Sequence, residues 1–291
     1  MFYASNIKEE DGKELSITIV EEITETDFKS LMSAFDYMGE LRPMDTAYKI
    51  MLRNANEFLH FTSEKTLKDI YFNHKTHESD IALNANRLIS NFCASMQTFI
   101  DYANKAVGRK ESKSKDSFSK YLSSLFDNEF CYRFFCKLRN FCVHYSFPYT
   151  TVVASAPNTI TLECHKSHLK RFSGWGAIVS KDFSDLPDIV DLHGYFDKLL
   201  VLLTTIQLNV YMFYAEDIFN ANKAIALFRD NHGLTAPTIL EIDENNVRRI
   251  RPIPISNVIQ DMKMIENHPN VSITFTDNVS EMSFEKHEVT P

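Results

Sequence analysis

Residues 79–107 read SDIALNANRLISNFCASMQTFIDYANKAV, and this stretch decides the fold. Its apolar side chains recur at steps of three, four and seven residues, which is the spacing of one face of a helix. The residues of that face are Ile81, Leu88, Ile89, Phe92, Met96, Phe99, Ile100 and Ala103. Gly108 follows directly and ends the pattern. We therefore predict a long amphipathic helix that buries one side in a helical core.

A second long helix is expected beyond a charged connection. Residues 109–115 read RKESKSK, and this composition favours a mobile loop. A short helix at about 116–126 and a long one at about 128–146 follow. Pro148 ends the long helix, because the residue before a proline is pushed out of the α region. Two long helices joined by such a loop are expected to pack antiparallel.

The remaining segments add helices and a few strands. The expected helices cover about 27–38, 45–60, 63–73, 193–230 and 255–265, and the expected strands cover 14–25, 151–155, 159–164, 238–242 and 271–275. Gly39 and Pro43 are expected to separate the first two helices, and the helix over 193–230 to bend near Ala215. The strands at 151–155 and 159–164 flank Ala156-Pro157-Asn158 and form a predicted hairpin.

The predicted fold class is mainly α. It is an antiparallel helical bundle with a small β-hairpin insertion and α/β additions at both ends. We expect three ranges: an N-terminal strand with helices at 1–77, the helical core at 78–230 and a C-terminal extension at 231–291.

Composition limits the possible functions. The chain has 291 residues, a net charge of −8 and a pI of about 5.7, which argues against a broad, non-specific nucleic-acid binder. A small basic cleft on an acidic body remains compatible with this charge. The most apolar run, 199–214, is shorter than the ~20 residues of a bilayer span and predicts a buried core helix without membrane contact. The five cysteines and the polar, acidic residues 1–20 indicate reduced thiols in a cytoplasmic protein.

Residues 134–148, FFCKLRNFCVHYSFP, form the stretch most suggestive of chemistry. On a helical wheel one face is apolar, and its members are Phe134, Leu138, Phe141 and Tyr145. A second stripe is polar, and its members are Arg133, Lys137, Asn140 and His144. The plain interpretation is a solvated helix face whose terminal histidine is favoured by the helix dipole.

The segment Arg139-Asn140-Phe141-Cys142-Val143-His144 resembles the Arg-x4–6-His motif of the HEPN superfamily of helical ribonuclease domains. In that motif a polar residue commonly follows the arginine, as Asn140 does here, and the motif lies near the end of the third core helix. Residues 86–101 are similar to the preceding family helix. The resemblance covers about residues 78–230, and it implies a HEPN-like bundle.

The resemblance also implies a metal-independent endoribonuclease in which the RNA 2′-hydroxyl attacks the adjacent phosphate. His144 suits the acid/base role near neutral pH. Arg139 suits stabilisation of the charge that builds on the phosphate. Asn140 would orient His144 or donate to the phosphate. Many similar proteins are toxin-like or anti-phage defence effectors, so an antitoxin or regulatory partner is compatible with this hypothesis.

Arg139 and His144 are five residues apart, so they point about 140° apart around an ideal helix. A reaching arginine, a distorted last turn or a second chain could bring the two groups to one phosphate. The resemblance implies the second chain, as a homodimer with a composite site. Tyr132, Cys136 and Val143, on the arginine side of the wheel, are then the interface candidates.

Lys137 and Arg133 extend the polar stripe and are predicted auxiliary RNA-binding residues. Other basic residues lie at 109–115 and at 166–171, where a solvated surface is the commoner role. Cys164, His165 and His168 lack the spacing of a zinc site, so we expect no metal and no cofactor.

A second hypothesis is a non-catalytic helical module that binds a nucleotide, RNA or a protein. A buried or backbone-capped His144, or an Arg139 that faces solvent alone, would favour it.

Overall fold

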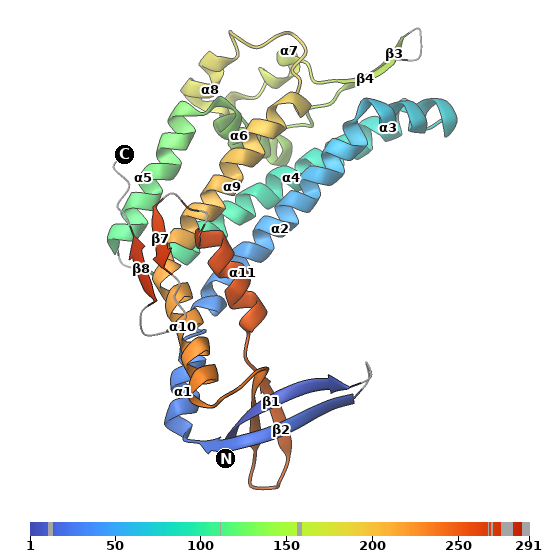
Figure 1. Ribbon diagram of the computed structural model, residues 1–291. Coiled ribbons are helices and arrows are strands. Elements are labelled where there is room, and N and C mark those ends of the chain that lie inside the picture. Colours follow the sequence, from blue (N-terminus) through green and yellow to red (C-terminus); the bar gives the residue numbers. More distant parts are fainter. Residues whose placement is uncertain are drawn as a thin grey trace. The chain divides into compact units, whose positions relative to one another are not determined.

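The computed structural model describes residues 1–10, 14–110, 112–155, 159–266, 268, 270–274 and 282–286. The protein is mainly helical with small antiparallel sheets (Figure 1). It divides into two compact units, one made of Met1–Leu41 with Leu208–Pro291 and the other of Arg42–Gln207. The division differs from the three expected ranges, because the two ends of the chain share one sheet.

The helical unit contains several of the helices predicted from the sequence. Its long helices are most of α2 (Tyr37–Thr62), α4 (Glu78–Val107), α5 (Ser112–Asn128), α6 (Phe130–His144) and the first part of α9 (Phe196–Phe213). Its short elements are α3 (Glu64–Lys68), the π-helical turn Asp69–Asn73, α7 (Lys166–Leu169), the 3-10 turn Ser173–Trp175, α8 (Gly176–Asp182) and the 3-10 turn His193–Tyr195.

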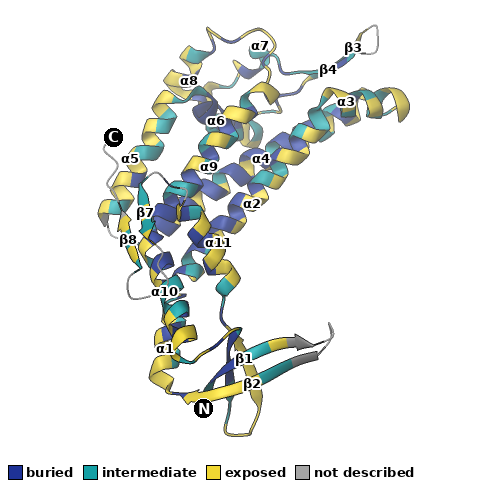
Figure 2. Ribbon diagram, in the orientation of Figure 1, coloured by how far each residue is buried: buried dark blue, intermediate teal, exposed yellow. Residues whose placement is uncertain are grey.

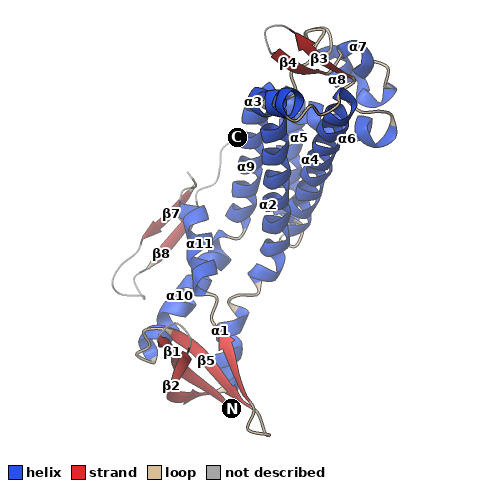
Figure 3. Cartoon of the chain, turned by 90° about the vertical axis from the view of Figure 1, so that its right-hand side faces the viewer, coloured by secondary structure: helices blue, strands red, loops and turns tan. Residues whose placement is uncertain are grey.

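Four helices meet in one aromatic cluster. Phe196 of α9 lies 4.9 Å from Phe58 of α2, 4.6 Å from Phe92 of α4 and 5.3 Å from Phe135 of α6, between ring centroids. All four rings are fully buried, and each such side chain stabilises the fold by roughly 1.5–3 kcal/mol. Figure 2 shows the buried residues along these helices, and Figure 3 shows α2, α4 and α9 running alongside one another. The cluster fixes α6 against α4.

The predicted long helix at 79–107 is confirmed as α4, and Gly108 is its C-cap. The expected loop at 109–115 is wrong in length, because α5 begins at Ser112. Lys113 and Lys115 therefore lie on a helix whose apolar residues, such as the buried Phe118, face inward.

The expected break at Gly39 and Pro43 is also wrong, because α2 continues through both residues. A proline inside a helix costs about 3 kcal/mol. Leu41 and Met44 are fully buried on the helix, and their burial stabilises it by roughly 1.5–3 kcal/mol each. Burial therefore outweighs the lost hydrogen bond. The break falls earlier, between α1 (Glu25–Ser33) and α2.

The hairpin of β3 (Thr151–Ser155) and β4 (Thr159–Glu163) is confirmed, and its predicted turn at 156–158 lies outside the described residues. Ile160 of β4 packs against Leu67 of α3 and Ile81 of α4 in a small core cluster. The bend near Ala215 is confirmed too, as Tyr214 separates α9 from α10 (Ala215–Asn231).

The other unit is built on a four-stranded antiparallel sheet in the order β2-β1-β5-β6. Its strands are β1 (Phe2–Glu10), β2 (Glu14–Ile23), β5 (Pro237–Ile242) and β6 (Arg248–Pro252). The strands predicted at 14–25 and 238–242 are β2 and β5. The pairing of β1 with β5, from Phe2↔Glu241 to Asn6↔Pro237, joins the two ends of the chain.

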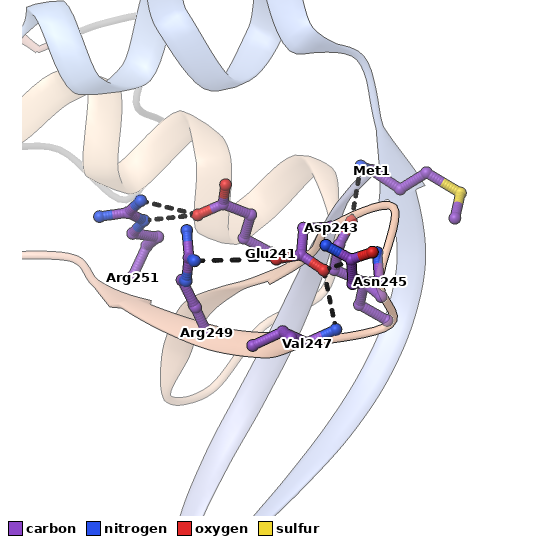
Figure 4. Close-up of polar contacts among 8 residues, drawn as sticks. Met1, Glu241, Asp243, Asn245, Val247, Arg249 and Arg251 are labelled. Atoms are coloured by element: carbon purple, nitrogen blue, oxygen red, sulfur yellow. Dashed lines mark hydrogen bonds and ion pairs between the residues drawn. The ribbon is translucent and has the colours of Figure 1, made fainter.

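The β5–β6 turn is held by one aspartate. Oδ1 of Asp243 accepts hydrogen bonds from the backbone N–H groups of Asn245 and Val247, each at 2.9 Å (Figure 4). Arg251 of β6 lies 2.8 Å from Oε2 of Glu241 on β5. This unit also contains α11 (Ile255–Glu266), predicted at 255–265, and the pair β7 (Val271–Thr274) and β8 (Ser283–Lys286). Phe275, the last residue of the strand predicted at 271–275, lies outside the described residues.

Candidate functional site

α6 carries the motif, and its buried side orients the helix. Phe134, Leu138 and Phe141 are fully buried, which confirms the predicted apolar face. Phe134 and Phe141 stack on Trp175, with ring centroids 5.5 and 5.7 Å away. Tyr145 is 47% exposed, so its expected place in the core is wrong. The reason is that Tyr145 is already beyond the helix, with φ −134° and ψ −66°.

Arg139 and Asn140 form a pair on the half-buried side of α6. Nη1 of Arg139 donates a hydrogen bond of 3.1 Å to Oδ1 of Asn140. The bond leaves the rest of the guanidinium fork without a partner among the described residues. A phosphate or carboxylate could occupy these remaining N–H groups, because the fork matches two anionic oxygens.

His144 is the last residue of α6 and is exposed. In the described part of the chain its imidazole makes no hydrogen bond and no ion pair, so both ring nitrogens are open to a ligand. α6 stays helical through His144, and the angle of about 140° between Arg139 and His144 therefore holds within one chain. The distortion at Tyr145 comes one residue too late to change it.

The chain that follows His144 is fixed by α4. The amide of Asn86 donates to the carbonyl of Tyr149 at 2.8 Å and accepts from the N–H of Tyr149 at 3.0 Å. Both residues are buried. His168 adds a contact of 3.1 Å between Nε2 and the carbonyl oxygen of Phe147. These contacts hold the end of α6 in place, and the sequence interpretation assigned Asn86 no such role.

Arg133 differs from its predicted role as an RNA-binding residue. Its Nε and Nη2 atoms lie 2.7 and 2.8 Å from the carboxylate of Asp182, and Nη1 donates to the carbonyl of Asp127 at 3.1 Å. The hydrogen bond to Asp182 raises the pKa of the guanidinium above its usual value. The side chain is 11% exposed. Arg133 therefore fastens α8 to α6 and is closed to RNA, a role that position on a wheel does not reveal.

Lys137 is half-buried, and its ammonium lies 5.9 Å from the ring centroid of Phe126 on α5. Of the three interface candidates, Val143 is 56% exposed, whereas Tyr132 is buried within the chain and Cys136 is half-buried. Tyr132 and Cys136 instead line a pocket of about 300 Å³ between α4, α5 and α6. Its lining residues are Gln97, Ile100, Asn104, Ser119, Leu122, Ser123, Phe126, Tyr132 and Cys136.

The thiols are poor nucleophiles. All five cysteines are free, and burial raises the pKa of Cys142 to about 11 and that of Cys136 to about 12. Cys142 therefore stays protonated near neutral pH beside His144. Cys164 is fully buried, and Nε2 of His165 lies 3.0 Å from the carboxylate of Glu163. Within the described residues, no group of three or more His, Cys, Asp or Glu side chains is placed to hold a metal ion.

Residues His193–Phe213 form the only described helical stretch that is long and apolar enough to cross a membrane by length and composition. Leu199, Leu203 and Ile206 on it are fully buried in the protein, whereas Val201 is 65% exposed.

No protein-family model, curated protein or solved structure matches this chain significantly.

Proposed function

We propose that the helical unit is a metal-independent endoribonuclease of the HEPN type, acting as a toxin-like or anti-phage defence effector in the cytoplasm. One observation carries the proposal: α6 ends on His144, which is exposed and has no partner in the described part of the chain, five residues after an arginine that is already hydrogen-bonded to Asn140. The buried face of α6 keeps His144 on the surface and leaves Arg139 and Asn140 half-exposed.

In this mechanism the 2′-hydroxyl of RNA loses its proton to the imidazole of His144 and attacks the adjacent phosphorus. The imidazolium of His144 then gives this proton to the 5′-oxygen of the next nucleotide, which leaves as a hydroxyl, and a 2′,3′-cyclic phosphate remains. The guanidinium of Arg139 stabilises the negative charge on the pentacoordinate phosphate. Asn140 holds one N–H group of Arg139 and thereby limits the directions that the fork can take.

The angle between Arg139 and His144 favours a site completed by a second copy of the chain. Val143 lies between the two residues, and Tyr145 and Phe147 follow; all three are large, apolar and about half exposed. Covering such side chains favours association. In a two-fold dimer the histidine of each copy would approach the arginine of its partner.

The test is incubation of the purified chain with total RNA in the presence of EDTA. Cleavage should proceed, and both Arg139→Ala and His144→Ala should reduce it by at least a hundredfold while circular dichroism stays unchanged. His60→Ala is a matched control on an exposed histidine of α2, away from α6, and it should keep most of the activity. Undiminished cleavage by His144→Ala would exclude the site.

The alternative, a binding module without catalysis, makes the opposite prediction in the same assay. The chain would retain RNA or nucleotide without cutting it, and its expression would not harm the host cell.

A further inference from the structure

The pocket between α4, α5 and α6 has the chemistry of a site for an uncharged ring. Ile100, Leu122 and Phe126 provide apolar surface. None of its lining residues is a carboxylate, a lysine or an arginine. Its volume of about 300 Å³ is at the lower end of the range for small-molecule pockets, about 300–1,000 Å³. It therefore has room for one heterocycle.

The polar groups of the pocket have unused hydrogen-bonding capacity. Gln97 donates through Nε2 to Asp101, and Asn104 donates through Nδ2 to the carbonyl of Ile100. Among the described residues neither amide oxygen has a partner, and neither do the hydroxyls of Ser119 and Ser123. Two acceptors and two hydroxyls can thus meet the donors and acceptors at the edge of a ring. Nucleobases displayed by single-stranded RNA are recognised through such edges and through apolar faces.

Positive charge lies at the rim and farther along the same helix. The ammonium of Lys137 lies 5.9 Å from the ring of Phe126, which lines the pocket. Arg139 follows Cys136 by three residues, about 4.5 Å along the axis and about 60° around it. A phosphate attached to a base in the pocket therefore has Lys137 beside it, and the next phosphate along a strand comes toward Arg139.

We propose that this pocket binds one base of the RNA strand, with Lys137 on the attached phosphate, next to the Arg139 side of the site. The proposal rests on the proposed ribonuclease function. A free nucleotide has the same chemistry, base plus phosphate, so the experiment separates the two sources.

The experiment measures binding of the full chain to two kinds of probe. One is a mixed-sequence hexanucleotide with 2′-O-methyl groups, which cannot be cut by 2′-hydroxyl attack. The other is each of the four nucleoside 5′-monophosphates. Ser123→Phe fills the pocket from the exposed face of α5, and Ser124→Phe, the exposed neighbour outside the lining, is the matched control.

The hexanucleotide should bind the unmodified chain and Ser124→Phe alike, and Ser123→Phe at least tenfold more weakly, because stacking and edge contacts of one base are lost. Lys137→Gln should weaken binding about threefold and reduce its salt dependence. Equal affinity of Ser123→Phe and the unmodified chain would overturn the proposal. A monophosphate that binds as tightly as the hexanucleotide would overturn the assignment to a strand and identify a free nucleotide as the occupant.

These outcomes are independent of catalysis. If the chain does not cleave RNA in the EDTA assay, the measured affinity for the hexanucleotide still decides whether the pocket binds a base. Unchanged binding by Ser123→Phe removes the base pocket while cleavage by Arg139 and His144 stays intact.

Discussion

At the scale of single residues, the bond between Arg139 and Asn140 distinguishes two substitutions of Asn140. Asn140→Ala frees the guanidinium, so we expect cleavage to fall about tenfold through poorer positioning. Asn140→Asp keeps the contact but places a negative carboxylate next to the guanidinium of Arg139. This carboxylate neutralises part of the positive charge that would stabilise the phosphate. Cleavage should then fall at least a hundredfold. Single-turnover kinetics with a labelled RNA measure both values, and an aspartate variant more active than the alanine variant would contradict the assigned role.

The residue scale also shows what the sequence could and could not supply. The apolar positions of α6 were predictable because helical spacing alone identifies Phe134, Leu138 and Phe141. The polar stripe was expected to be accessible along its whole length, and this expectation was wrong for Arg133. Arg133 and His144 share a stripe on the helical wheel. Arg133 nevertheless forms an ion pair with Asp182, and its side chain is only 11% exposed. That partner is remote in sequence, and periodicity carries no information about it.

At the scale of elements, Asn86 of α4 clamps the chain that follows α6 through its two hydrogen bonds to Tyr149, and this clamp leads to a quantitative prediction. Asn86→Ala leaves the buried N–H and carbonyl of Tyr149 without their partner, which costs roughly 2–4 kcal/mol. Urea unfolding followed by circular dichroism measures the loss.

Asn91→Ala, an exposed position on the same helix, is the control and should change stability by less than about 0.5 kcal/mol. Equal stabilities for the two variants would mean that the clamp contributes nothing.

Long elements were predictable and short or interrupted ones were not. α4 has thirty residues and an unbroken apolar face, so local periodicity suffices. The break predicted at Pro43 was wrong because burial of side chains keeps α2 continuous, and burial depends on the whole fold. β6 has five exposed residues and no alternation, and its position follows from pairing with β5.

At the scale of the whole molecule, the buried thiols predict a loss of stability in alkali. Burial holds the pKa of Cys142 at about 11 and those of Cys136 and Cys164 at about 12, against 9.0 for an ordinary thiol. The unfolded chain therefore loses these protons first. Their stabilising effect is complete below pH 9 and declines as pH rises toward 12, by up to about 1.4 kcal/mol per pH unit for each thiol.

Urea midpoints at pH 8, 9.5 and 11 should decrease in that order. Cys136→Ala, which removes one of the three groups, should make the decline shallower. A midpoint that is constant up to pH 11 would show that the thiols are not shielded as the structure has them.

The pairing of β1 with β5 has a consequence for synthesis. A ribosome releases α4, α5 and α6 well before it makes Pro237–Ile242, the strand that β1 needs on its open side. The nascent chain thus already contains Arg139, Asn140 and His144 while β1 is still unpaired on the side where β5 will bind. Any early activity at the exit tunnel would arise from a molecule whose sheet is unfinished.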